Sequence, residues 1–182
     1  AKVIIGDGVV INGDKIDIKS QATSSASSLV VSTVMGFVVG ISTSESKLEI
    51  GSAGGDPVYI ASDGDLNIYS NTSTRLAVST FVMHFGYGPG KLFDVAFTYG
   101  EANNTNNLLI HNNVTLVAGG NADLKAESLK NSDIGANAWA FENGRAAVAL
   151  SILIEDSTVN AWMNGSAFVA GFFKLHAEQE TK

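Results

Sequence analysis

One short segment recurs four times along this chain of 182 residues, and the recurrence limits the architectures that the chain can adopt. Each copy is a turn residue followed by alternating apolar and polar residues, and it ends in small or polar side chains. The starts of the copies are 50, 56 and 51 positions apart. A repeat of this length indicates stacked units that share one continuous core. The copies read DKIDIKSQA from Asp14, GDLNIYSNT from Gly64, GNADLKAES from Gly120 and GFFKLHAEQ from Gly171.

The rest of each repeat also follows a common order. A short alternating strand precedes the middle two copies, at residues 58–60 and 114–116, and Val10 takes this place in the first. A long alternating apolar stretch follows, over residues 28–41, 76–99 and 136–154. The sequence therefore predicts a single β-rich repeat domain over residues 1–182, with about 50–56 residues per repeat. The approximate units are 1–57, 58–113 and 114–166, with a partial unit at 167–182.

Apolar residues alternate with a period of two, and no stretch sustains the spacing of an amphipathic helix, so the sequence predicts an all-β fold. One architecture is a right-handed parallel β-helix, or β-solenoid, in which each repeat makes about two rungs. The other is an antiparallel β-sandwich or hairpin stack, which the turn signals Asn143-Gly144 and GYGPG at residues 86–90 favour. Glycine and asparagine suit the tight corners of a solenoid, so we expect the β-helix. Projecting hairpins at the two turn signals would combine both architectures.

The most apolar stretch covers residues 29–41 (LVVSTVMGFVVGI). Its 13 residues are too few to span a bilayer, so we expect no membrane span. The large apolar residues share one parity, interrupted only by Thr33, and this period of two predicts a pair of strands buried on at least one face. They are Leu29, Val31, Met35, Phe37, Val39 and Ile41.

Charge and cysteine content exclude several classes of function. The chain has 11 basic and 18 acidic residues, a net charge of −7, and no cysteine. Binding to a phosphate backbone needs a basic surface, so we expect no nucleic-acid partner. The lack of cysteine excludes disulfides, thiolate metal sites and thiol catalysis. Only 16% of the residues are charged and 45% are hydrophobic, which is the opposite of a disordered segment.

Residues that commonly hold metals do not form a recognisable motif. The sequence GGNADL at residues 119–124 is similar to a glycine-rich calcium loop, but its spacing differs and an ordinary glycine corner is favoured. His84, His111 and His176 have no histidine or carboxylate at ligand spacing. We therefore expect no metal and no cofactor.

Catalytic motifs are also missing. There is no Gly-x-Ser-x-Gly sequence and no clear grouping of serine, histidine and aspartate. Acidic residues near predicted turns, such as Asp7, Asp63 and Asp65, are expected to make Asx turns or to face solvent. The sequence therefore predicts no enzyme. A β-helix that cleaves polysaccharides with carboxylates from neighbouring rungs is the enzymatic alternative.

Four aromatic residues are candidates for ligand contact or for packing: Trp139, Trp162, Phe172 and Phe173. The two tryptophans could stack on sugar rings, but packing in the core is favoured. Phe172 and Phe173, with Phe168, predict a surface that a neighbour covers. A cluster of asparagines predicts either side-chain ladders between rungs or a polar loop. The cluster comprises Asn103, Asn104, Asn106, Asn107, Asn112 and Asn113.

Three stretches resemble the degenerate repeats of giant bacterial filamentous adhesins, the haemagglutinin-like and leukotoxin-type exoproteins of two-partner and related secretion systems. They are VTLVAGGNADLKAES from Val114, AAVALSILIEDSTVNAW from Ala146 and GFVVGIS from Gly36. The resemblance rests on pattern and composition and covers nearly the whole chain. It implies a long β-solenoid shaft outside a cell, without catalytic residues. The chain departs from this pattern in its aromatic residues between Phe81 and Tyr99 and in the turn at Pro89.

The expected function is therefore that of a non-enzymatic structural or adhesive segment of an extracellular bacterial fibre or surface adhesin. The expected partners are neighbouring repeats, copies of the same chain, or a glycan or protein on a host or cell surface. Two alternatives are open: a self-assembling extracellular filament subunit, and a carbohydrate-binding or polysaccharide-cleaving β-helix module.

Overall fold

The computed structural model describes residues 1–33, 35–83, 93–140 and 146–182. These residues form twelve β-strands and no helix, which confirms the all-β prediction. Accordingly, the described residues include no helix that is long and apolar enough to cross a membrane. The strands are β1 (Lys2–Ile5), β2 (Val10–Gly13), β3 (Ile16–Ser32), β4 (Met35–Ile50), β5 (Val58–Ser62), β6 (Leu66–Met83), β7 (Phe93–Ile110), β8 (Val114–Ala118), β9 (Ala122–Trp139), β10 (Ala146–Met163), β11 (Ser166–Val169) and β12 (Phe173–Thr181).

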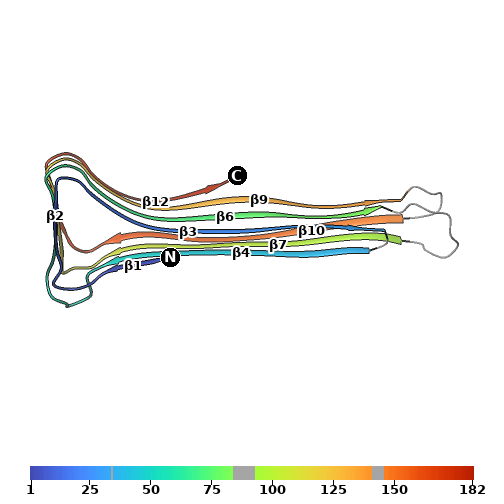
Figure 1. Cartoon of the computed structure of the whole chain (residues 1–182), viewed down its shortest axis with the longest axis horizontal. Coiled ribbons are helices and arrows are strands. Elements are labelled where there is room, and N and C mark those ends of the chain that lie inside the picture. Colours follow the sequence, from blue (N-terminus) through green and yellow to red (C-terminus); the bar gives the residue numbers. More distant parts are fainter. Residues whose placement is uncertain (34, 84–92, 141–145) are drawn as a thin grey trace.

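The strands form three parallel sheets of four strands each. Sheet A has the order β1-β4-β7-β10, sheet B the order β2-β5-β8-β11, and sheet C the order β3-β6-β9-β12. The chain passes through sheets A, B and C in turn, and each circuit makes one coil of a parallel β-solenoid (Figure 1). The solenoid prediction is confirmed, and the antiparallel alternative is wrong, because every strand pair between neighbouring coils is parallel.

The four copies of the repeated segment lie in register on successive coils. Ile16 pairs with Leu66, Leu66 with Ala122, and Ala122 with Phe173. The turn residues of the copies also stack, since the amide of Gly64 donates to the carbonyl of Asp14 (2.7 Å), and the amides of Gly120 and Gly171 continue this column. The expectation of about two rungs per repeat is wrong. Each repeat makes a single coil, because the long strands of sheets C and A use most of its residues.

The long strands form an arm in which each strand of sheet C faces the following strand of sheet A: β3 faces β4, β6 faces β7, and β9 faces β10. Facing strands interact through side chains, as Ser24 Oγ and Ser42 Oγ do at 2.9 Å. Their backbones pair only with neighbouring coils, so each pair is a β-arch and the expected hairpins do not form. The turn signals Asn143-Gly144 and GYGPG at 86–90 lie outside the described residues. Figure 1 shows the arm running lengthwise, with sheet B crossing its left end.

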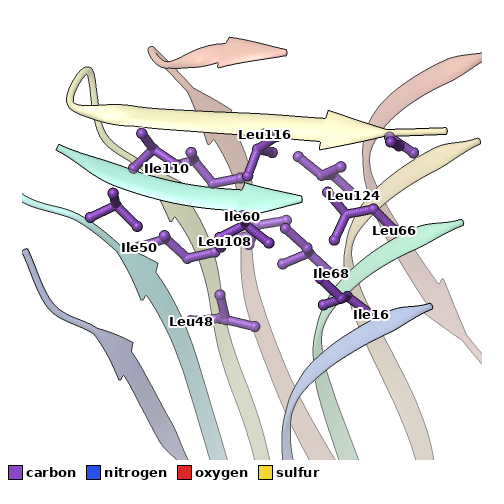
Figure 2. Packing of buried hydrophobic residues seen from close by; sticks show 14 of the residues in the cluster. Ile16, Leu48, Ile50, Ile60, Leu66, Ile68, Leu108, Ile110, Leu116 and Leu124 are labelled. Atoms are coloured by element: carbon purple, nitrogen blue, oxygen red, sulfur yellow. The ribbon is translucent and has the colours of Figure 1, made fainter. Parts of the chain in front are cut away.

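The main hydrophobic core lies where the three sheets meet. Large aliphatic side chains from all three sheets point into this space, and Leu48, Ile60 and Leu66 are fully buried (Figure 2). They form columns of apolar side chains, since each inward position recurs on every coil. Removing a side chain of this size from such a core typically costs about 2–5 kcal/mol. The core therefore stabilises the base of the arm.

The interior of the arm consists mainly of small and polar side chains. A second, smaller apolar cluster is formed by Val38, Leu76, Val78 and Ala102. Serine, threonine and asparagine fill most of the other inward positions and bond across the arch, as Ser46 Oγ does to Ser20 Oγ at 2.8 Å. The two sheets approach closely because inward positions such as Gly40 and Gly100 have no side chain.

The outward positions of the arm on sheet A carry large apolar residues. The predicted strand pair in residues 29–41 exists, as the end of β3 and the start of β4; β4 is buried on one face, whereas the inward positions at the end of the edge strand β3 are only half-buried. In β4 the buried positions are Gly36, Val38 and Gly40, while Met35 and Phe37 are 68% and 61% exposed. The large apolar residues that share one parity therefore face away from the interior of the solenoid.

Candidate functional site

Side chains of opposite charge form a ladder on the outer face of sheet C near the main core. Lys125 Nζ lies 2.9 Å from Glu178 on the next coil and 3.1 Å from Glu127 on its own strand. His176 Nε2 lies 3.2 Å from Asp123 Oδ1, and the Tyr69 hydroxyl donates to Asp123 Oδ2 at 3.2 Å. These contacts join three coils, because β6, β9 and β12 are neighbours in the sheet.

The charged groups of this ladder stabilise one another as ion pairs, and the pKa shifts of three of them follow from these contacts and from burial. The bond from Lys125 lowers the pKa of the Glu178 carboxyl, and the same bond raises the pKa of Lys125. Burial, followed by the nearby Asp123 carboxylate, raises the pKa of the Tyr69 phenol. Each shift stabilises the ordinary charge state near neutral pH, whereas general acid–base catalysis needs a pKa near the working pH. The ladder therefore stabilises the stacking of coils.

A second polar group lies on the outer face of sheet A. Glu49 accepts a bond from Lys47 at 2.7 Å, and His111 Nε2 lies 2.9 Å from the other carboxylate oxygen. These contacts, with Lys47 contributing most, lower the pKa of Glu49. The Trp162 ring meets the His111 ring edge-on, with centroids 6.1 Å apart. This group joins β4, the His111 turn and β10 across three coils.

The acidic residues near the predicted turns stabilise the corners. The Asp7 carboxylate accepts bonds from the Ser52 hydroxyl (2.6 Å) and the Asn113 amide (2.8 Å), and these bonds lower its pKa. Asp65 Oδ1 accepts the backbone amide of Asn121 at 2.8 Å. Both carboxylates are exposed, as one of the two expectations has it, and they accept hydrogen bonds from other coils rather than forming the expected Asx turns.

The calcium-like sequence forms a corner of the solenoid. A side chain at Gly119 or Gly120 would collide with the backbone of the coil below, at Asp63 and Gly64, which explains the two glycines. Asp123 points outward into the charged ladder. Over the ranges given for the structure, no three histidine, aspartate or glutamate side chains come close enough together to hold a metal ion. His84 lies outside the described residues.

The candidate aromatic residues do not form one surface. Trp139 and Trp162 are 51% and 47% exposed, so the interpretation as core residues is wrong for both. Trp139 lies at the far end of β9 on the outer face of sheet C, against Phe81 (5.9 Å between ring centroids), whereas Trp162 lies on sheet A. Phe173 continues the inward column above Ala122 and is 44% exposed, because it lies on the last of the described coils. Phe172 is an exposed corner residue.

The asparagine cluster lies mainly in strand β7, so the polar-loop interpretation does not hold for it. Asn104 and Asn106 point inward and bond across the arch: Asn104 Nδ2 donates to Ser128 Oγ (2.8 Å), and Asn106 Nδ2 donates to the carbonyl of Glu127 (2.6 Å). Asn107 faces outward and accepts a bond from Asn160 on the next coil (2.9 Å). The contact between Asn107 and Asn160 matches the predicted ladder between rungs, Asn113 joins coils through Asp7, and the inward pair joins sheets A and C.

Both ends of the solenoid expose open strand edges. At the first coil, β3 is the edge of sheet C, and β1 covers only residues 47–50 of β4. At the last coil, β10 is the edge of sheet A, and β12 covers only residues 122–130 of β9. Residues 35–46 of β4 and residues 131–139 of β9 are therefore open edges as well. Open parallel edges present unpaired amide and carbonyl groups that can bind a further strand.

Apolar columns of the core also reach both ends. Ile16 and Ile18 form the first level of two columns in sheet C, and Phe173 and Leu175 form the last. Leu175 is 36% exposed, although its partner Leu124 on the preceding coil is fully buried.

Comparison of the chain with protein-family models, curated proteins and solved structures finds no match. The role of the open ends is therefore inferred from their exposed apolar residues and unpaired strand edges.

Proposed function

We propose that this chain is a non-enzymatic structural or adhesive segment of an extracellular bacterial fibre, in which further coils continue the solenoid at its ends. The observation that carries the proposal is the apolar column that remains uncovered at the last coil, at Phe173 and Leu175. Another coil would cover these side chains and pair the open edge of β10 at once. A parallel solenoid gains stability from each added coil, since every coil contacts only its neighbours.

The charges at the two ends support stacking in the same direction. Asp17, Asn67, Asp123 and Lys174 occupy one outward column of sheet C, in that order. A first coil stacked on a last coil would place Asp17 next to Lys174, so opposite charges would meet. This arrangement favours a head-to-tail contact over contacts between two like ends.

The arm favours neighbouring repeats over separate subunits as the partner. If two separate chains stacked end to end with their cores in line, the short strands β12 and β1 would lie at the junction. Neither strand extends along the arm, so the arm would lack one arch between β10 of one chain and β4 of the next. A neighbouring repeat could contribute one further arch of the same design. This arch would pair the open part of β9 at one end of the junction and the open part of β4 at the other. The self-assembling filament subunit is the second candidate, and the open edges themselves favour it.

Electron microscopy of the purified chain distinguishes these two candidates. We expect single particles with some concentration-dependent end-to-end contacts, whereas long uniform filaments would support the subunit. Leu175→Lys places a charge in the exposed apolar column and should abolish end-to-end contacts. His176→Lys, one residue later on the outward side, places a cation near Asp123 and should leave the contacts intact. Equal effects of the two variants would contradict stacking through the core columns.

The carbohydrate alternative has a separate test. Trp139 and Trp162 lie on different sheets, so they cannot form one platform for a sugar chain. We expect no binding on a glycan array and no release of reducing ends from acidic polysaccharides. Binding that is lost in Trp162→Ala, or any release of reducing ends, would overturn the non-enzymatic structural proposal.

The extracellular location can be tested on intact cells. Antibodies raised against the purified chain should label cells without permeabilisation if the segment belongs to a surface fibre. Labelling that requires permeabilisation would contradict an extracellular fibre. The stacking proposal would be unaffected, because it depends only on the ends of the solenoid.

A further inference from the structure

Outward residues of the arm on sheet A form one continuous apolar surface across three coils. Parallel pairing places them in rows: Phe37, Phe97 and Leu150 form one row, and Val39, Tyr99 and Ile152 form the next. Glu101 is the only charged residue in these rows. We call this surface the apolar outer face; it consists of Met35, Phe37, Val39, Ile41, Val95, Phe97, Tyr99, Val148, Leu150, Ile152 and Ile154.

The apolar outer face is large and well exposed. Its residues on β4 and β10 are between 38% and 68% exposed. At its centre the rings of Phe37 and Phe97 stack with centroids 5.1 Å apart and planes within 6°. Exposed apolar patches of several hundred Å² mark interaction sites on soluble proteins. Eight large apolar residues that are about half exposed present an area of the order that a stable interface buries on one partner, about 800 Å².

The opposite broad surface of the arm has different chemistry. The outward positions of sheet C opposite the rows of Val39 and Ile41 include Ser25, Arg75, Asn131 and Asp133, whereas Leu29 and Val31 are exposed nearer the far end of β3. Parallel sheets are almost always covered on both faces, and the inner face of sheet A is covered by sheet C. The outer face of sheet A is therefore a broad apolar surface that the described strands leave exposed.

We propose that the apolar outer face packs against the same face of a second copy of this chain. A contact between identical faces is self-complementary and closes at two copies, because the same surface of each copy is used up. Glu101 lies at the end of the face next to the polar row of Thr43, Asn103 and Asp156, where a charge stays in contact with water. The hydrophobic rows can then pack as the two sheets of a sandwich do.

The charge of the chain argues against a lipid surface as the partner. The net charge is −7, and the charged residues at the polar end of the face, Glu101 and Asp156, are acidic. Anionic membranes attract basic segments and repel acidic ones. A second copy brings an uncharged apolar surface instead, so the contact buries no unpaired charge.

Sedimentation velocity of the purified chain tests the proposal. The wild type should sediment as a dimer, with twice the chain mass of 19.0 kDa. Val39→Lys introduces a cation into the middle of the face. The symmetric contact would then bury two cations, one from each copy. Burial of unpaired charges should weaken the dimer at least about 100-fold, so that the variant sediments as a monomer. Circular dichroism checks that the fold is kept, since Val39 points away from the interior.

Two control variants separate this contact from others. Thr23→Lys changes a β-branched outward residue on the edge strand of sheet C, and it should remain dimeric. Leu175→Lys should also remain dimeric, because it affects end-to-end stacking and not the broad face. A monomeric wild type, a dimeric Val39→Lys, or binding of the wild type to neutral lipid vesicles through this face would each overturn the proposal.

Discussion

The close approach of sheets A and C can be tested at Gly100, an inward position on the inner strand β7. A Cβ atom at Gly100 would lie 2.9 Å from Ile134 Cγ2, 2.9 Å from Leu76 Cδ2 and 3.4 Å from Leu153 Cδ1. The first two distances are shorter than real Cβ contacts, which begin to be ordinary at 3.4 Å. Gly100→Ala therefore requires the facing atoms to move by about 0.5 Å.

The neighbours of Gly100 cannot easily give way. The Ile134 methyl group is attached to a branched Cβ with a strongly preferred rotamer, and Leu76 is fully buried. Overpacking of this kind costs about 1–3 kcal/mol, and the lower chain entropy of alanine in the unfolded state offsets about 0.4–1 kcal/mol. We expect a net loss of about 1–2 kcal/mol in the free energy of unfolding, or roughly 2–8 °C in Tm for a chain of this size.

Thermal and urea unfolding followed by circular dichroism measure the effect. Gly135→Ala is the matched control, because this glycine is also in a long strand but its added Cβ would meet nothing closer than Ser79 Oγ at 3.7 Å. The control should be as stable as the wild type or slightly more stable. If Gly100→Ala were as stable as the wild type, or if both variants lost the same stability, the packing argument would be refuted.

Two further predictions concern polar contacts. Asn106→Ala removes buried hydrogen bonds to Ser70 and to the carbonyl of Glu127 inside the arm and should cost about 3 kcal/mol in urea unfolding; Asn107→Ala, at a half-buried outward position, should cost little, and equal losses would contradict this difference. Asp7 has a lowered pKa in the folded chain, so its contribution to stability is present above the ordinary pKa of aspartate and is lost as the pH falls through the lowered folded value. The difference in urea midpoint between the wild type and Asp7→Asn should therefore shrink below about pH 4; a difference that grew on acidification would show that the sign is wrong.

The sequence predicts the stacking of the coils well because stacking depends on recurrence. Asp14, Gly64, Gly120 and Gly171 are recognisable as equivalent turn residues, and in the structure their backbones bond in one column. The number of rungs per repeat could not be predicted in the same way. It depends on whether the long apolar stretches pair within a repeat or between repeats, and alternation of residue types is the same in both cases.

The sequence predicts the candidate surfaces only in part. Phe173 was expected to be a residue that a neighbour covers, and it does lie at the open end of a core column. The partnership of Lys125 and Glu178 joins residues that are 53 positions apart, and no local motif indicates it. Such pairs become visible only when the register between coils is known.

The inner side of the arm is identified by its glycines rather than by its large apolar residues. In the sequence MGFVVGI from Met35, Phe37 and Val39 share the parity that would ordinarily face a core. Added Cβ atoms at Gly36 and Gly40 would run into side chains of β6, so these two positions must face sheet C. When two sheets approach this closely, the smallest residues mark the inner face and the large apolar residues of the same strand face outward. A strand that is apolar at both parities therefore predicts coverage on both faces, and the second copy that we propose would supply the second covering surface from outside the solenoid.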